Sequence, residues 1–147
     1  MGNANLGNIL ALKQYNKINL HTGIESASPH RLIQMLLEGA LGKLAQAKGH
    51  MKLSDVAKKG EDVSMAISII GGLRDSLDHE KGGEIAINLD SLYEYMTYRL
   101  MEANLKNDVA MLDEVYGLLM EIKSAWDAIA EQPAVAQVEK RLEQPAA

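Results

Sequence analysis

Apolar residues recur every three to four positions through four long stretches of this 147-residue chain, and this spacing constrains the fold more than any other feature. A helix, with about 3.6 residues per turn, places such residues on one face, whereas a half-buried strand needs strict alternation. No alternating stretch competes with the helical pattern. The sequence therefore predicts an all-α protein, an antiparallel up-down-up-down four-helix bundle in which each helix buries one apolar face.

Capping and helix-breaking residues set the expected limits of the helices. Serine and proline at 28 and 29 suit a helix start, and so do Ser54-Asp55 and Asn107-Asp108, because their side chains accept hydrogen bonds from free N–H groups. Gly82 and Gly83 are expected to separate the second helix from the third. The predicted helices span residues 28–51, 54–79, 84–105 and 108–131.

The bundle is expected to occupy residues 28–131, between an N-terminal arm (1–27) and a C-terminal tail (132–147) with one or two helical turns. The apolar residues of the arm suit docking on the bundle, where the arm would cover part of its surface. The inner faces predicted from the periodicity begin at Ile33, Val56, Ile85 and Met111.

Composition excludes several classes of function. The net charge of −5 argues against nucleic acid as a partner, because phosphate binding needs a basic surface. The absence of cysteine excludes disulfides and zinc–thiolate sites. No stretch reaches the ~18 apolar residues of a membrane span, and residues 1–8 lack the pattern of a secretory signal. These features are compatible with a cytoplasmic protein, and we expect no membrane insertion.

No catalytic or cofactor-binding pattern is present. The four histidines lack the Glu-x-x-His spacing of a metal site in a bundle, and they are expected at the surface or at helix ends. A Walker loop and a G-x-S-x-G motif are also missing. His79 and Lys81 partly resemble the H-x-x-K-G pattern of histidine phosphotransfer bundles, but the lysine is two residues on rather than three. We expect no enzyme, no cofactor and no metal, with phosphotransfer through His79 as an alternative.

The chain has more apolar residues than four inner faces need, and they predict a partner-binding groove. Methionine is frequent among them, and its flexible side chain adapts to different partner sequences. The candidate groove residues on the helices are Met65, Ile69, Ile87, Tyr98, Met101, Leu105, Tyr116 and Met120. Scattered surface hydrophobics are normal, however, and residues 1–27 and 134–142 would also be able to cover this surface. A general adaptor for amphipathic helices is a second interpretation.

Two segments carry a resemblance to a known family. ASPHRLIQMLLEGA (27–40) and KGGEIAINL (81–89) resemble the flagellar secretion chaperones of the FliS family, and the likeness extends over roughly residues 12–130. It implies a cytoplasmic four-helix bundle that binds the C-terminal segment of flagellin, prevents premature polymerisation and delivers flagellin to the type III export apparatus. The export gate and regulatory flagellar proteins are further partners that it implies.

The resemblance also implies a role for the arm. Leu12 and Tyr15 match the positions of a family segment that can cover part of the groove, so both are expected to be associated with it. The chain departs from the family in two ways: the stretch before Tyr15 is longer than in many relatives, and Leu37 stands where an aromatic residue is common. Both departures concern the shape of the groove.

Overall fold

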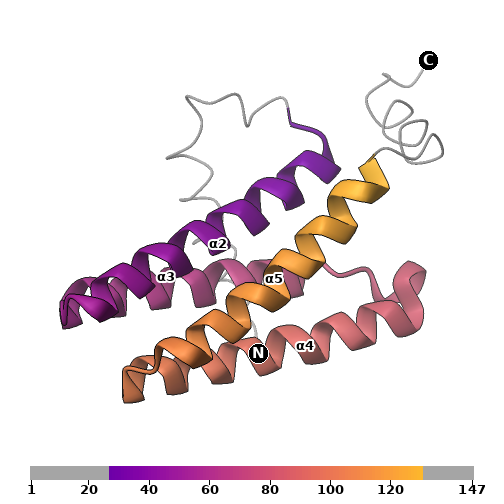
Figure 1. Ribbon diagram of the computed structural model, residues 1–147. Coiled ribbons are helices and arrows are strands. Elements are labelled where there is room, and N and C mark those ends of the chain that lie inside the picture. The colour runs from indigo at the N-terminus through magenta and orange to yellow at the C-terminus, as the bar shows by residue number, and fades with distance from the viewer. Residues whose placement is uncertain (1–26, 131–147) are drawn as a thin grey trace.

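A computed structural model of the chain describes residues 27–130, which form four α-helices joined by short turns. In chain order they are α2 (Pro29–Lys52), α3 (Val56–Asp75), α4 (His79–Lys106) and α5 (Val109–Ala130). Consecutive helices run in opposite directions (Figure 1), and α2 and α4 each pack on both α3 and α5. The predicted all-α helical bundle is confirmed. None of the helices in this part of the chain is long and apolar enough to cross a membrane.

The predicted helix starts are confirmed at three places by capping hydrogen bonds. The Ser28 hydroxyl accepts from the Arg31 N–H at 3.1 Å. The Asp55 and Asp108 carboxylates accept from N–H groups three residues on, at 3.2 Å in both cases. Each such cap stabilises a helix by about 1 kcal/mol, so short polar residues are enough to position the helix starts.

The junction between α3 and α4 differs from the prediction. α3 ends at Asp75 rather than near His79, and α4 begins at His79 because the Asp78 carboxylate accepts from the next free N–H groups. The glycine pair lies inside α4, where Gly83 has φ 51° and ψ −123° and kinks the helix. The prediction that the glycine pair separates the second and third helices is therefore wrong: the helices are separated at residues 76–78, and the glycines only kink α4.

The core lies between all four helices and is almost entirely aliphatic, with Tyr93 as its buried aromatic ring. α2 and α3 pack over a face wider than one stripe, so adjacent residues are buried together, as in Leu36–Leu37 and Ile69–Ile70. Leu37, where the family often has an aromatic residue, is completely buried. The other fully buried large side chains are Leu44, Val63, Leu73, Met96, Leu100, Leu112, Val115 and Leu119.

Three inner-face or groove predictions are wrong. Ile69, predicted to lie off the core, is 2% exposed because the broad α2–α3 contact buries it. Val56 and Ile85, predicted to start inner faces, are 70% and 71% exposed. Val56 is the first residue of α3, and Ile85 follows the kink at Gly83, so neither lies in the straight stretch from which the helical register was projected.

Candidate partner-binding groove

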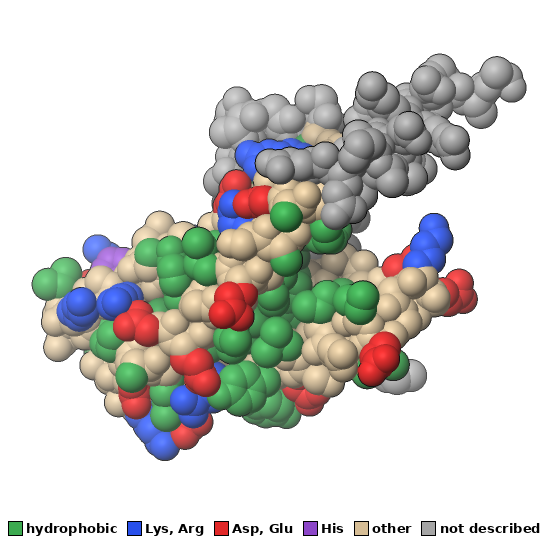
Figure 2. All heavy atoms as spheres, turned by 45° about the vertical axis from the view of Figure 1, so that its right-hand side comes forward, with side chains coloured by type: hydrophobic (Ala, Val, Ile, Leu, Met, Phe, Trp, Pro, Cys, Tyr) green, Lys and Arg blue, Asp and Glu red, His purple; other side chains and the backbone are tan. Residues whose placement is uncertain are grey.

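Four apolar side chains project from α4 on the side opposite its buried face. Ile87, Tyr98, Met101 and Leu105 are 59%, 64%, 55% and 85% exposed, and we call them the α4 strip. Figure 2 shows hydrophobic side chains gathered on one face of the bundle with acidic side chains among them. Exposed apolar groups at neighbouring positions of one helix are the usual mark of a surface that another protein covers.

A groove between α3 and α4 adjoins this strip. It has a volume of about 480 Å³, and Met101 and Leu105 of the strip form part of its wall. Val63 and Ile67 of α3 line the opposite side, with Ser64, Glu102 and Asn104 at its polar edges. The C-terminal part of the strip therefore adjoins the groove, whereas Ile87 is separated from it by the polar side chains Asp90 and Glu94.

Polar contacts tie α3 to α4 near both ends of the groove. Toward the end of α3, Arg74 binds Asp90 through two hydrogen bonds, of 2.6 and 3.1 Å, and Glu94 lies 3.4 Å away. The hydrogen bond from Arg74 holds the pKa of Asp90 below its usual value, and the same bond raises the pKa of Arg74. Toward the start of α3, Lys59 donates to the Asn104 carbonyl oxygen at 3.0 Å. The apolar part of the groove lies between these two contacts.

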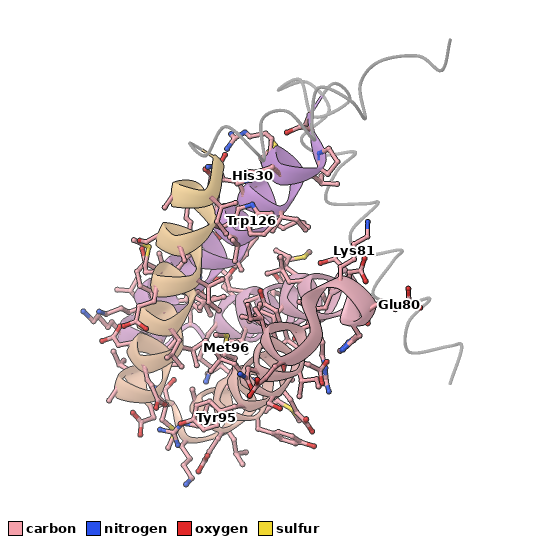
Figure 3. All side chains as sticks on the ribbon, turned by 90° about the vertical axis from the view of Figure 1, so that its right-hand side faces the viewer. His30, Glu80, Lys81, Tyr95, Met96 and Trp126 are labelled. Carbon is pink, nitrogen blue, oxygen red and sulfur yellow. The ribbon has the colours of Figure 1, made fainter. Side chains whose placement is uncertain are left out.

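The seam between α4 and α5 is polar and borders the strip on its other side. The Tyr95 hydroxyl and Arg99 Nε donate to the Glu114 carboxylate at 2.8 and 2.7 Å. These two hydrogen bonds lower the pKa of Glu114, and the bond from Tyr95 has the larger effect. Figure 3 shows Tyr95 and its neighbour Met96, of which Met96 is fully buried while Tyr95 is exposed. The groove beside Met101 and Leu105 opens toward α3, where Val63 and Ile67 line it.

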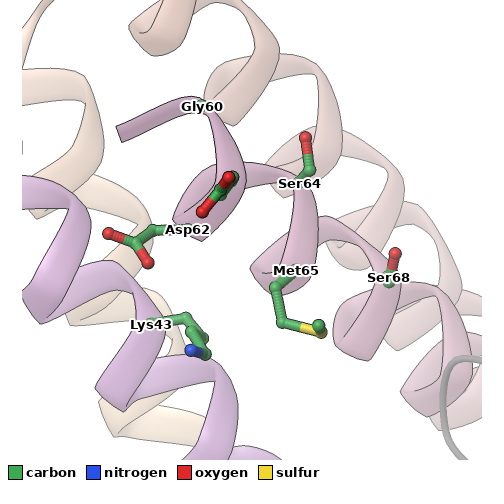
Figure 4. Close-up of a pocket in the computed structure, with 7 residues that line it drawn as sticks. Lys43, Gly60, Asp62, Ser64, Met65 and Ser68 are labelled. Atoms are coloured by element: carbon green, nitrogen blue, oxygen red, sulfur yellow. The ribbon is translucent and has the colours of Figure 1, made fainter. Parts of the chain in front are cut away.

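The remaining predicted groove residues lie at two other places. Tyr116 of α5 lines a hollow of about 220 Å³ between α2 and α5, and Met120, one turn on, is 40% exposed. Met65 lines a pocket of about 650 Å³ between α2 and α3, shown in Figure 4, in which most of the other lining residues are polar. This pocket shares Ser64 with the α3/α4 groove, so the two lie on either side of one α3 residue.

The structure thus brings together Tyr98, Met101 and Leu105 of the predicted set, while Ile87 lies farther along the same side of α4 and the others lie elsewhere. Leu12 and Tyr15 lie outside the described residues. Sequence reasoning missed Val63 and Ile67 as groove residues because it placed both on the inner face. Ile67 is in fact only partly buried. The sequence did contain a signal for Ile67, namely its position at the edge of the inner face, because residues at such an edge touch both the core and the surface.

His30 and His50 lie in the first and last turns of α2, at helix ends as expected, and both make specific contacts. His30 is 7% exposed and stacks on Trp126, and its ring nitrogens have no hydrogen-bond partner among the described residues. His50 Nδ1 lies 2.6 Å from the Asp62 carboxylate. His79 is exposed and begins α4 rather than ending a helix, with Lys81 two residues later in the same turn. Within residues 27–130, no group of three or more His, Asp and Glu side chains is placed to hold a metal ion.

The fold and the exposed groove together define a helical-bundle protein whose surface suits the amphipathic helix of another protein. Apolar residues spaced by three and four positions, beside an apolar groove, are the recurring features of helix-in-groove recognition. Many charged side chains on the described surface pair with one another, as Arg74 does with Asp90 and Arg99 does with Glu114.

Comparison with known proteins identifies the family to which this chain belongs. The sequence model of Flagellar protein FliS matches residues 11–133. The chain is 53% identical to the flagellar secretion chaperone FliSB of Pseudomonas aeruginosa, over 82% of this chain and 95% of the relative. It is 48% identical to FliS of Salmonella typhimurium (81% and 89%) and 33% identical to FliS of Bacillus subtilis (70% and 76%). The chain belongs to the FliS family, whose named members here are chaperones and not enzymes.

Proposed function

We propose that this protein is a cytoplasmic export chaperone that binds the C-terminal segment of flagellin, prevents its premature polymerisation and delivers it to the type III export apparatus. The observation that carries the proposal is the exposed C-terminal part of the α4 strip, Tyr98, Met101 and Leu105, beside the α3/α4 groove. The relatives' description as flagellar secretion chaperones supports the same reading.

The spacing within the strip fits a helical client. Tyr98, Met101 and Leu105 are three and four residues apart, so they face the same way on α4. A client helix that presents apolar residues at the same spacing can interdigitate with them. The apolar area buried offsets the entropy lost when a disordered client segment becomes ordered. Binding of this kind needs no catalysis, because release can follow from competition by another partner.

Calorimetry with a synthetic peptide of the flagellin C-terminal segment tests the proposal. We expect the unmodified protein to bind this peptide, and Met101→Lys or Tyr98→Asp to weaken binding while the helical circular dichroism stays unchanged. Both side chains are more than half exposed, so their replacement should not unfold the bundle. Ala128→Lys, which adds a charge at an exposed α5 position away from the strip, is the matched control.

Three other outcomes would contradict the proposal. Equal affinity for unrelated amphipathic helices would instead indicate a general adaptor. Unfolding of the Met101 and Tyr98 variants would show that these residues belong to the core. Phosphoryl transfer to the protein that is lost in His79→Ala would favour the phosphotransfer alternative.

A further inference from the structure

A buried lysine stands beside the α3/α4 groove. Lys59 is 6% exposed and lies on α3 one turn before Val63, which lines the groove. Its ammonium group donates to the Asn104 carbonyl oxygen at 3.0 Å and to Asn107 Oδ1 at 3.1 Å. Asn104 also lines the groove, and Asn107 caps the C-terminal end of α4. Lys59 therefore joins α3 to α4 where the groove reaches the end of the bundle.

Within residues 27–130, the charge of Lys59 has no counter-ion. Both of its acceptors are neutral, and no ion pair among the described residues includes it. An ammonium group has three N–H donors, and the described residues supply acceptors for two of them. A buried charge without a carboxylate is costly, since desolvation is only partly offset by neutral hydrogen bonds.

Three carboxylates near Lys59 on α3 or at the edge of the groove have other partners, while Glu61, two residues on, is exposed. Asp62, one turn after Lys59 on α3, is paired with His50 at 2.6 Å. Glu102, at the edge of the groove, is paired with Lys106 at 2.7 Å. The Asp55 carboxylate caps α3, where it accepts from the Lys58 N–H. A buried cation thus stands beside an apolar groove, and Asp55, Asp62 and Glu102 bind groups other than its ammonium group.

We propose that Lys59 forms an ion pair with a carboxylate of the client helix bound in the α3/α4 groove, an inference that rests on the proposed function. The four-carbon stem of lysine lets the ammonium group turn from Asn107 toward the groove without a backbone shift. The carboxylate is either an Asp or Glu side chain of the client or its C-terminal carboxylate. Both groups are carboxylates and would pair with Lys59 in the same way. They differ in that a C-terminal carboxylate requires the client chain to end beside Lys59.

The ion pair would add selectivity that apolar contacts lack. Met101, Leu105 and Ile67 can pack against many amphipathic helices, because apolar contacts tolerate shifts of register. A single buried cation accepts only a helix that places a carboxylate at the same point along the groove. Lys59 would therefore set the register and direction of the client, and a helix without that carboxylate would leave the charge unpaired.

The test compares Lys59→Met and Lys59→Arg with Lys58→Met, a matched control at the adjacent, exposed lysine. Calorimetry with the flagellin C-terminal peptide is run at low and high salt. We expect Lys59→Met to weaken binding by roughly tenfold or more and to reduce its salt dependence, whereas Lys59→Arg retains part of the affinity and Lys58→Met changes it little. A folded Lys59→Met that binds with unchanged affinity and salt dependence overturns the proposal and leaves Lys59 as a helix cap alone.

A second arm keeps the test decisive if Lys59→Met does not fold. The unmodified protein is titrated with client peptides in which each Asp is replaced by Asn, each Glu by Gln, or the C-terminal acid by its amide, one at a time. We expect one replacement to weaken binding by roughly tenfold, and its identity shows the source of the carboxylate. If no replacement matters although the unmodified peptide binds, the ion pair is refuted while the proposed function stands. If the unmodified peptide does not bind, the proposed function itself fails.

Discussion

The imidazole ring of His30 lies flat against the indole ring of Trp126, with ring centroids 4.7 Å apart and planes within 9° of parallel. Trp126 Nε1 also donates to the His30 carbonyl oxygen at 2.9 Å. His30 is in the first turn of α2, and Trp126 is in the last two turns of α5 (Figure 3). The pair therefore joins the N-terminal turn of α2 to the C-terminal turns of α5, which are far apart in the sequence.

Replacement of Trp126 should measure the strength of this contact. We expect Trp126→Ala to lower the free energy of unfolding by about 2–3 kcal/mol, less than for a fully buried ring, because Trp126 is only partly buried. Trp126→Phe keeps a stacked ring and loses the indole hydrogen bond, so about 1 kcal/mol is expected. Urea unfolding followed by circular dichroism gives both values, since Trp126 is the single tryptophan and its fluorescence is lost. Equal losses in the two variants would show that stacking adds nothing.

The kink at Gly83 predicts opposite effects for two glycine-to-alanine substitutions. Gly83 has φ 51°, where a Cβ is strained, so Gly83→Ala should destabilise the protein by about 1 kcal/mol. Gly42 lies within α2, and a Cβ there would meet nothing within 4 Å. Gly42→Ala should therefore stabilise it by up to about 1 kcal/mol, because alanine favours the helix. Thermal unfolding of the two variants provides the comparison, and a stabilised Gly83→Ala would show that the kink is not required.

The Arg74–Asp90 pair predicts a pH-dependent contribution to stability. Asp90 has a lowered pKa in the folded state because it accepts hydrogen bonds from Arg74. A carboxylate with a lowered pKa stabilises the folded state above its unfolded pKa of about 3.9 and loses that contribution as pH falls through the folded value. Asp90→Asn should thus be less stable than the unmodified protein near neutral pH by up to about 1 kcal/mol, since both side chains are partly exposed.

The difference between the two proteins should shrink as the pH is lowered below about 4. Urea unfolding at several pH values measures it. A difference that persists unchanged in acid would indicate a packing effect of the substitution rather than an ion pair.

The N-terminal arm leads to a separate prediction. Residues 1–20 include Leu12 and Tyr15, which the family resemblance associates with the groove. If the arm covers part of the apolar surface, its deletion should tighten binding of the flagellin peptide or promote self-association. Calorimetry and light scattering measure these effects. No change in either would mean that the arm is a passive tail.

Much of the fold could be read from local signals. Ser28, Asp55 and Asp108 cap the helices where the sequence predicted, because a cap is made by residues within one turn of each other. The α4 strip was also predictable, since Tyr98, Met101 and Leu105 fall opposite the inner face of a straight helix. The prediction of burial failed at Ile85, because this residue follows the kink in α4. The prediction of exposure failed at Ile69, because burial of a residue at the edge of a face depends on how closely the neighbouring helix approaches.

For residues 27–130, the sequence by itself determined the four helices, the starts of α2, α3 and α5, and the surplus of apolar residues on α4, because periodicity and capping are properties of neighbouring residues. Only the tertiary structure decided which side chains meet across helices. Stacking of His30 on Trp126 and burial of Lys59 beside Asn104 join residues far apart in the chain. Their contacts depend on how the helices pack, and helical spacing within one segment carries no information about that packing.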